Sequence, residues 1–310
     1  MRKIWGLLRN HLVVDFYWPY YLSVASFLTI SLFLNAHFDF ESIIDPYNGT
    51  YMRLMGYFLL YAFAYYGGLA LTLAFNKKAR LLATPKFWLL SLFGLVILSL
   101  NSGFPYLGQL TDLFHVDYRA FSWTYLVINN AIGFILVCLP LFLVYSFFPK
   151  PNGEGYGLIT PRYDFKPYLI LLMLMLPLIA GASFTTGFNN FYPIYKLNSV
   201  AEVWQVPKWV PMAIYEFFYG MDFFNVELLF RGFMVVGLSQ LLGKDAIMPM
   251  VTTYCFLHFG KPTGEAISSV FGGYILGVLA YYTRGIWGGV IIHMGIALMM
   301  ELAAYLQKLQ

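Results

Sequence analysis

The sequence predicts an all-α protein, a polytopic integral membrane bundle of eight to nine spans. The first observation is composition: 60% of the 310 residues are hydrophobic and 11% are charged, whereas soluble domains carry about 25% charged residues. The second is length, because eight or nine spans of about 20 residues with short loops account for the whole chain. The third is that basic residues fall in alternate loops. A soluble fold of this size has no way to hide so much apolar surface.

Nine apolar runs define the expected spans in chain order. They cover residues 17–36, 52–75, 86–104, 121–148, 167–188, 211–242, 246–260, 265–283 and 286–307. The seventh run is short, so it is either a half-span or a buried helix. Aromatic residues lie near the run ends, as in the aromatic belts of membrane proteins. These residues are Trp18, Tyr20, Tyr21, Trp88, Trp123, Trp209 and Trp287.

Basic residues in the loops predict the orientation. They precede the first span and lie in every second connection after it, and all fall on one side if the N-terminus is cytoplasmic. They are Arg2, Lys3, Arg9, Lys77, Lys78, Arg80, Lys86, Lys150, Arg162, Lys166, Lys244 and Arg284. Acidic residues, Asp39, Glu41 and Asp45, follow the first span. We therefore expect a plasma (inner) membrane protein with a cytoplasmic N-terminus, whose first apolar run is retained because no signal-peptide cleavage site follows it.

The net charge, the two cysteines and the distribution of ionisable residues bear on the partners and on the domain organisation of the chain. The net charge of +4 reflects the basic loops and does not indicate a nucleic-acid partner. Cys138 and Cys255 lie in apolar runs and are expected to be buried and free. The first five runs carry few ionisable groups and the last four carry several. The prediction is an N-terminal set of membrane-spanning helices, residues 1–188, and a helical core that holds the functional site, residues 189–310.

Several ionisable side chains lie inside apolar runs of the C-terminal part, among them Glu227, Arg231, His258 and His293. A charged side chain at the bilayer centre costs about 2.5–3.5 kcal/mol on insertion scales. Glu227 and Arg231 are four residues apart, so they share one helix face and are expected to pair. His258 and His293 lie on two further runs. Because each of these groups is costly in lipid, we expect Glu227, His258 and His293 to converge in one hydrated cavity.

Each of these side chains also has a purely structural interpretation. The charged pair can lock helices together, and a single buried histidine can be satisfied by a backbone carbonyl. Glu216 and Glu301 are expected near the membrane interfaces. Lys261 and Glu265 are expected in a solvated turn.

The order and spacing of these groups resemble a known family. The pattern is Glu-Leu-Leu-Phe-Arg-Gly at residues 227–232, then Tyr254 with His258 four residues beyond it, then His293. It resembles the CPBP family, the CAAX protease and bacteriocin-processing (Abi) family of intramembrane glutamate endopeptidases. The resemblance covers roughly residues 211–305.

The sequence departs from all three family motifs, which read Glu-Glu-x-x-x-Arg, Phe-x-x-x-His and His-x-x-x-Asn/Asp. Val226 stands where the first glutamate is expected, Tyr254 is a mild change from Phe, and Ala297 stands where Asn or Asp is expected. The sequence is similar to a bacterial branch whose first motif has a single glutamate. With the first glutamate replaced, Glu227 is the residue expected to act as base.

The resemblance implies a CAAX-type endopeptidase that hydrolyses a peptide bond of a small or membrane-associated peptide. It implies that Glu227 and His258 activate a water molecule, that His293 donates to the oxyanion, and that Arg231 is the supporting ion-pair partner. The implied partners are a peptide or lipidated-peptide substrate and the lipid bilayer. No cofactor is expected.

Three alternatives stay open. Val226 and Ala297 favour a catalytically inactive relative that acts as a membrane scaffold, immunity or regulatory protein. Glu227, His258 and His293 are also a possible set of zinc ligands, although no His-Glu-x-x-His pattern is present. A transporter is the third alternative, because buried ionisable groups mark proton routes, but the chain lacks paired half-repeats with broken helices.

Overall fold

A computed structural model describes residues 2–15, 17–76, 79–147, 155–159, 164–196 and 200–308. These residues form helices and connecting loops, without a strand among them. The long helices are α1 (Arg2–Asp15), α2 (Trp18–Phe38), α4 (Tyr51–Asn76), α5 (Pro85–Gly103), α7 (Tyr118–Phe147), α8 (Lys166–Ala182), α11 (Trp209–Glu227), α13 (Ile247–Phe256), α14 (Thr263–Thr283) and α15 (Trp287–Gln307). The short helices are α3 (Phe40–Ile44), α6 (Leu107–Asp112), α9 (Thr186–Phe191), α10 (Val200–Val203) and α12 (Ser239–Leu242). A π-helical segment, η4 (Leu228–Gly237), continues α11, and 3₁₀ turns are η1 (Asp45–Tyr47), η2 (Ala79–Ala83), η3 (Gly155–Gly157) and η5 (Gly243–Ala246).

The all-α membrane bundle predicted from composition is confirmed. Seven helical runs of the described chain are long and apolar enough to cross a membrane, and one of them is the long run through α11, η4 and α13. Helix α8 is apolar but shorter. Helix α13 has 10 residues and is therefore only about 15 Å long. Its length fits the half-span or buried helix expected for the seventh run. Helix α1 was not expected as a separate element.

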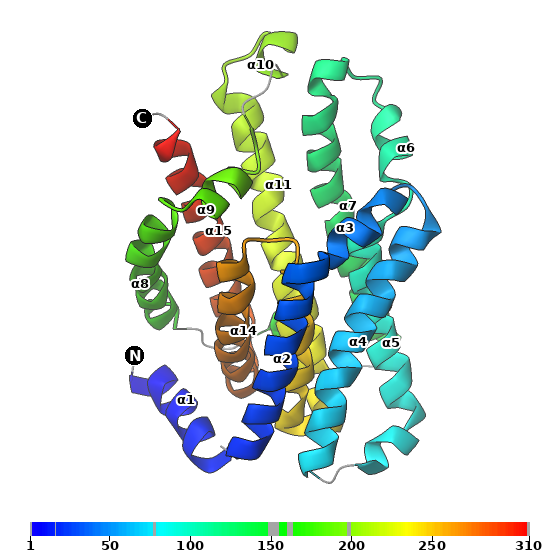
Figure 1. Cartoon of the computed structure of the whole chain (residues 1–310), viewed down its shortest axis with the longest axis vertical. Coiled ribbons are helices and arrows are strands. Elements are labelled where there is room, and N and C mark those ends of the chain that lie inside the picture. The colour runs from blue at the N-terminus through cyan, green and yellow to red at the C-terminus, as the bar shows by residue number, and fades with distance from the viewer. Residues whose placement is uncertain are drawn as a thin grey trace.

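The most deeply buried part of the bundle is the run from residue 209 to residue 256. In its best membrane-spanning window 72% of the residues are buried, against 17% for α2 and 33% for α7. Helix α13 packs between α4 and α14, and α11 packs against α7 and α15 (Figure 1). The C-terminal part thus forms the centre of the bundle. Cys138 and Cys255 are buried and free, as predicted.

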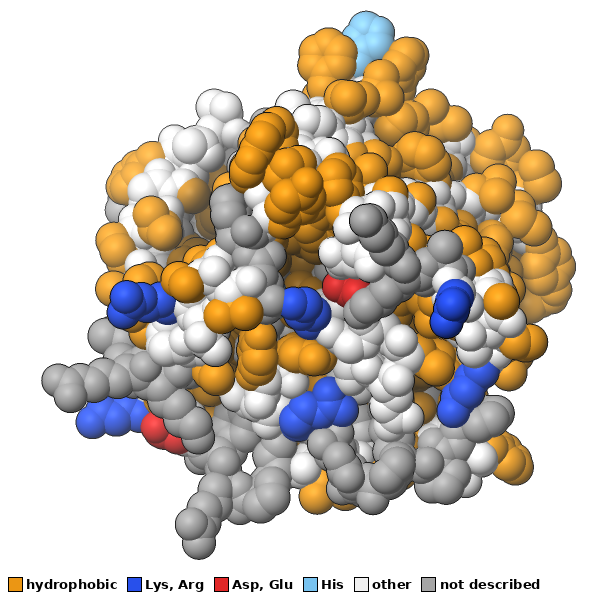
Figure 2. All heavy atoms as spheres, turned by 90° about the horizontal axis from the view of Figure 1, so that it is seen from below, with side chains coloured by type: hydrophobic (Ala, Val, Ile, Leu, Met, Phe, Trp, Pro, Cys, Tyr) orange, Lys and Arg blue, Asp and Glu red, His pale blue; other side chains and the backbone are white. Residues whose placement is uncertain are grey.

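Basic side chains gather at the lower end of the bundle. Figure 2 shows Lys and Arg side chains spread over this end, where η5 and the α14–α15 connection lie. Basic residues also lie elsewhere, because Arg53 pairs with Asp45 of η1 and Arg119 pairs with Asp117. The orientation with a cytoplasmic N-terminus therefore stays a prediction. Lys77, Lys78, Lys150 and Arg162, which entered the orientation prediction, lie outside the described residues, as do the side chains of Arg2 and Lys3.

Candidate active site

The candidate site begins where α11 changes into the π-helical segment η4. Glu227 is the last residue of α11, and all ten residues of η4 are buried. The wider π-turn is marked by the backbone N–H of Leu238, which donates to the carbonyl of Phe233 five residues earlier at 3.0 Å. Such turns occur frequently at functional sites. The turn carries Arg231 into the centre of the bundle.

Glu227 and Arg231 form the predicted ion pair. Glu227 Oε1 lies 3.0 Å from Arg231 Nη1, and the two side chains are 0% and 1% exposed. Arg231 Cζ also lies 4.2 Å from the centre of the Tyr254 ring, which is a cation–π contact. A β-carbon added at Gly289 would overlap Glu227 Oε2. Glycine at this position therefore lets α15 approach the carboxylate.

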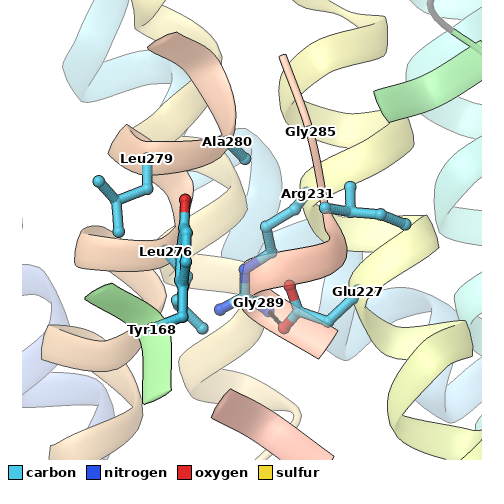
Figure 3. A pocket seen from close by; sticks show the side chains of 9 residues that line it. Tyr168, Glu227, Arg231, Leu276, Leu279, Ala280, Gly285 and Gly289 are labelled. Carbon is cyan, nitrogen blue, oxygen red and sulfur yellow. Dashed lines mark ion pairs between the residues drawn. The ribbon is translucent and has the colours of Figure 1, made fainter. Parts of the chain in front are cut away.

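The space beside this ion pair is too small for a water molecule. It is lined by Glu227 and Arg231 together with Tyr168, Leu276 and Gly289 (Figure 3). Proton transfer from a water requires direct or single-water contact. In this structure the carboxylate of Glu227 is enclosed and paired with a cation, and its expected role as the base stays a prediction.

His293 connects this ion pair to Tyr254. Its Nδ1 lies 3.1 Å from Glu227 Oε1, and its Nε2 lies 3.1 Å from the Tyr254 hydroxyl. A carboxylate only accepts hydrogen bonds, so Nδ1 carries a proton. In the neutral imidazole Nε2 then accepts from the tyrosine. Donation to an oxyanion, the expected role of His293, therefore requires the imidazolium form, in which Nε2 also carries a proton.

The hydrogen bond of His258 selects the same tautomer as in neutral His293, with the proton on Nδ1. The Nδ1 of His258 donates to the backbone carbonyl of Tyr254 at 2.8 Å, which leaves Nε2 as an acceptor in the neutral ring. Burial lowers the pKa of His258 well below its usual value, and the nearby charge of Lys261 acts in the same direction. His258 is therefore neutral at pH 7 and offers a lone pair. The nearest carboxylate oxygen, Glu265 Oε1, lies 4.0 Å from Nε2, beyond hydrogen-bond distance.

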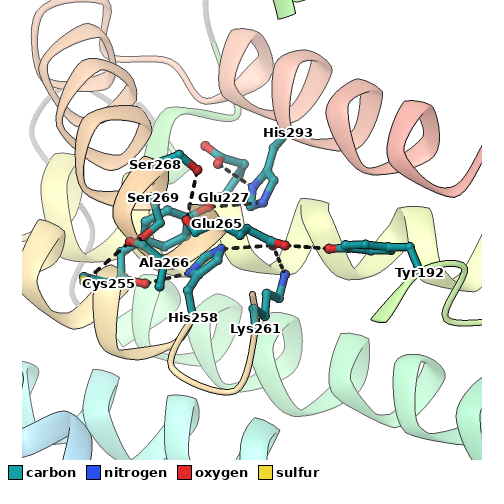
Figure 4. A network of polar contacts seen from close by, with 11 residues as sticks. Tyr192, Glu227, Cys255, His258, Lys261, Glu265, Ala266, Ser268, Ser269 and His293 are labelled. Carbon is teal, nitrogen blue, oxygen red and sulfur yellow. Dashed lines mark hydrogen bonds and ion pairs between the residues drawn. The ribbon is translucent and has the colours of Figure 1, made fainter. Parts of the chain in front are cut away.

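The turn after α13 is more ordered than expected for a solvated loop. Lys261 Nζ lies 2.8 Å from Glu265 Oε1, and the Tyr192 hydroxyl donates to Glu265 Oε2 at 2.8 Å (Figure 4). This network ties the turn carrying His258 to the segment after α9. Glu301, expected near a membrane interface, is 5% exposed and accepts from the backbone N–H of Ile194 at 2.9 Å.

One cavity brings the two predicted histidines together. It measures about 170 Å³ and lies among α5, α7, α11, the turn after α13, and α15. Its lining includes His258, His293 and Val226, but Glu227 is not among the lining residues. Glu227 reaches this cavity through its contact with His293 at 3.1 Å: consecutive residues of a helix point about 100° apart, so when Val226 faces the cavity Glu227 faces the ion pair. The shared catalytic role of Glu227, His258 and His293 stays a prediction.

The last motif position lies in an apolar cluster. Ala297 is 5% exposed and packs with Tyr219 and Phe223, so no amide or carboxylate is supplied there. Two features that shape the site were not predicted from the sequence, namely Asp222 on the cavity wall and the hydroxyl of Tyr254. Asp222 precedes Val226 by four residues, and such residues share a helix face, but the sequence does not show which face meets the cavity.

A zinc site formed by Glu227, His258 and His293 stays a prediction. Among the described residues, no group of three or more His, Cys, Asp and Glu side chains is arranged to hold a metal ion. Glu227 and His293 are in contact, whereas the hydrogen bond of His258 Nδ1 goes to a backbone carbonyl.

Comparison with known proteins identifies the class of the C-terminal part. Residues 208–299, less than a third of the chain, match the family described as type II CAAX prenyl endopeptidase Rce1-like. The matched segment runs from the start of α11 into α15. It contains Glu227, Arg231, Tyr254, His258 and His293. No curated protein and no solved structure matches the chain. The resemblance to the CPBP family is thus confirmed: this is a polytopic membrane protein with an Rce1-like segment.

Proposed function

We propose that the chain is an intramembrane endopeptidase that hydrolyses a peptide bond of a small or membrane-associated peptide, including a lipidated one. The observation that supports the proposal is that His258 and His293 line one cavity and that both belong to the Rce1-like segment. Hydrolysis in a membrane requires a space that admits water, and this cavity is large enough for water molecules. The proposed environment is the plasma membrane, with the N-terminus on the cytoplasmic side.

The histidines have different proposed roles because their hydrogen bonds differ. His258 accepts from the attacking water at Nε2, since its Nδ1 is occupied by the Tyr254 carbonyl. His293 donates from Nε2 to the oxyanion in its imidazolium form, while Nδ1 stays bonded to Glu227. Glu227 and Arg231 position His293 without contacting substrate.

A cleavage assay on the full-length chain in proteoliposomes tests the proposal. The probes are an internally quenched peptide that ends in a CAAX sequence with a farnesylated cysteine, and the same peptide without the lipid. We expect cleavage by the wild type and a loss on the order of 100-fold or more in His258→Ala, the size typical of a general acid–base group. His37→Ala is the matched control, because His37 is exposed at the end of α2, far along the chain from the cavity residues.

Two results would contradict the proposal. One is that a folded wild-type protein cleaves neither peptide. The other is that His258→Ala cleaves as fast as His37→Ala. The inactive scaffold is the alternative that the first result favours, and the apolar surroundings of Ala297 are the observation that supports it.

A further inference from the structure

The cavity contains a carboxylate that the sequence motifs do not assign. Among the described residues that line it, Asp222 is the one acidic side chain. It lies on α11 one turn before Val226, which lines the same cavity. Residues four apart share a helix face. Asp222 thus places a carboxylate on the cavity wall. Glu227, the residue after Val226, is not among the residues that line this wall.

The surroundings of Asp222 leave its carboxylate facing open space. Its Oδ1 accepts a weak hydrogen bond from Asn225 Nδ2 at 3.5 Å. A β-carbon added at Gly133 of α7 would lie 3.6 Å from Asp222 Oδ1 and 2.7 Å from Asn101 Oδ1. Both oxygens therefore lie close to α7, and Asn101 Oδ1 comes so near that only glycine fits at residue 133. Asn101 Oδ1 is buried without a hydrogen-bond partner among the described residues, and Asn101 and Asp222 line the same cavity, so a water in this cavity is suited to donate to these oxygens.

Asp222 is also free of a cation at ion-pair distance within the described part of the chain. Lys261 lines the same cavity, but its ammonium already lies 2.8 Å from Glu265. Glu227, by contrast, is paired with Arg231 and bonded to His293. Two carboxylates one and a half turns apart on a single helix therefore have separate surroundings: one is enclosed and neutralised, and the other faces the cavity.

We propose that Asp222 is the catalytic carboxylate that takes the proton from the hydrolytic water. The proposal rests on the proposed function. The water oxygen bonds to the carbonyl carbon of the scissile peptide as one of its protons passes to Asp222. The C–N bond then breaks, and the leaving nitrogen takes that proton from Asp222. The products are a carboxyl group that holds the water oxygen and an amine, and Asp222 returns to its starting form.

The test compares cleavage by the full-length wild type, Asp222→Asn and Asp222→Ser with the two CAAX peptides. We expect both variants to lose on the order of 100-fold or more in kcat with little change in KM, since they bind substrate but lack the proton acceptor. Asp112→Asn is the matched control, because Asp112 is an exposed carboxylate at the end of α6. Thermal unfolding of each purified variant identifies any that fails to fold.

A rescue variant separates chemistry from structure. Val226→Glu added to Asp222→Asn returns a carboxylate to the same face one turn along, and we expect it to recover on the order of 10-fold of the lost kcat. Folded Asp222→Asn and Asp222→Ser proteins that cleave within about threefold of the wild type would overturn the proposed role of Asp222. That result would leave the proposed function unaffected. A wild type that cleaves neither peptide would overturn the proposed function and this proposal with it.

Discussion

Replacing Gly289 by alanine tests the packing of α15 against the buried carboxylate of Glu227. The added β-carbon would overlap Glu227 Oε2 and lie 2.9 Å from the carboxyl carbon. Carbon atoms in contact stay about 3.5–4.0 Å apart, so the carboxylate must move by about 0.6 Å or more. That shift lengthens the 3.0 Å contact with Arg231 and the 3.1 Å contact with His293.

The expected cost combines two terms. Overpacking a tight core costs about 1–3 kcal/mol. If the carboxylate leaves Arg231 altogether, an unpaired buried charge raises the cost to about 3–5 kcal/mol. A Gly→Ala change in a helix interior favours the helix by about 0.5–1 kcal/mol, which offsets only part of this. The helix gain is shared by any Gly→Ala change within a helix, so relative to such a control we expect Gly289→Ala to lower the free energy of unfolding by at least about 1 kcal/mol.

Thermal unfolding of the purified full-length protein measures the effect. Gly272→Ala on α14 is the matched control, because a β-carbon at Gly272 meets no atom within 4 Å. A cost of 1 kcal/mol corresponds to roughly 2–4 °C in Tm for chains of about this length. We expect Gly272→Ala to leave Tm unchanged or raise it, and Gly289→Ala to lower it. Equal Tm values for the two variants would refute the assigned contact between Gly289 and Glu227.

Three further predictions concern the groups around the site. Glu227→Gln and Arg231→Met should each destabilise the fold by about 3–5 kcal/mol, and the double variant should cost less than their sum; strictly additive costs in thermal unfolding would contradict the buried pair. Tyr254→Phe removes the hydroxyl bonded to His293 and should lower kcat about 2–10-fold; an unchanged kcat would show that this bond does not serve cleavage. Burial raises the pKa of Glu41 from 4.5 to about 7, so its stabilising contribution is full below pH 4.5 and lost as pH rises through about 7. Glu41→Gln should therefore remove the fall in Tm over this interval, and an identical pH profile would be the contrary result.

The spans were predictable because a membrane requires about 20 consecutive apolar residues. Helix α4 was expected at residues 52–75 and begins and ends within one residue of that range. Helix α1 was missed because its polar residues interrupt the apolar run, so its sequence does not signal a span. The division of the chain near residue 188 stays a prediction.

The site was predictable in its residue types but not in the direction of each side chain. The four-residue spacing of Glu227 and Arg231 correctly predicted their ion pair. The rotation of α11 about its own axis depends on tertiary packing, and it decides whether residue 226 or residue 227 faces the cavity. The π-turn that follows also has no reliable sequence signal. For both reasons, the enclosed position of Glu227 and the exposure of Asp222 to the cavity required a structure.

The most direct test of the account is whether blocking the cavity stops cleavage. In a Cys138→Ser/Cys255→Ser background, Val226→Cys places a thiol on the cavity wall beside His258 and His293. The measurement is the rate of CAAX-peptide cleavage before and after treatment with a water-soluble methanethiosulfonate reagent, with the same background that retains valine as control. The account predicts that the thiol reacts, that substrate slows its reaction, and that cleavage stops only in the Val226→Cys protein. Complete labelling of this cysteine with cleavage unchanged would contradict the claim that peptide hydrolysis takes place in this cavity.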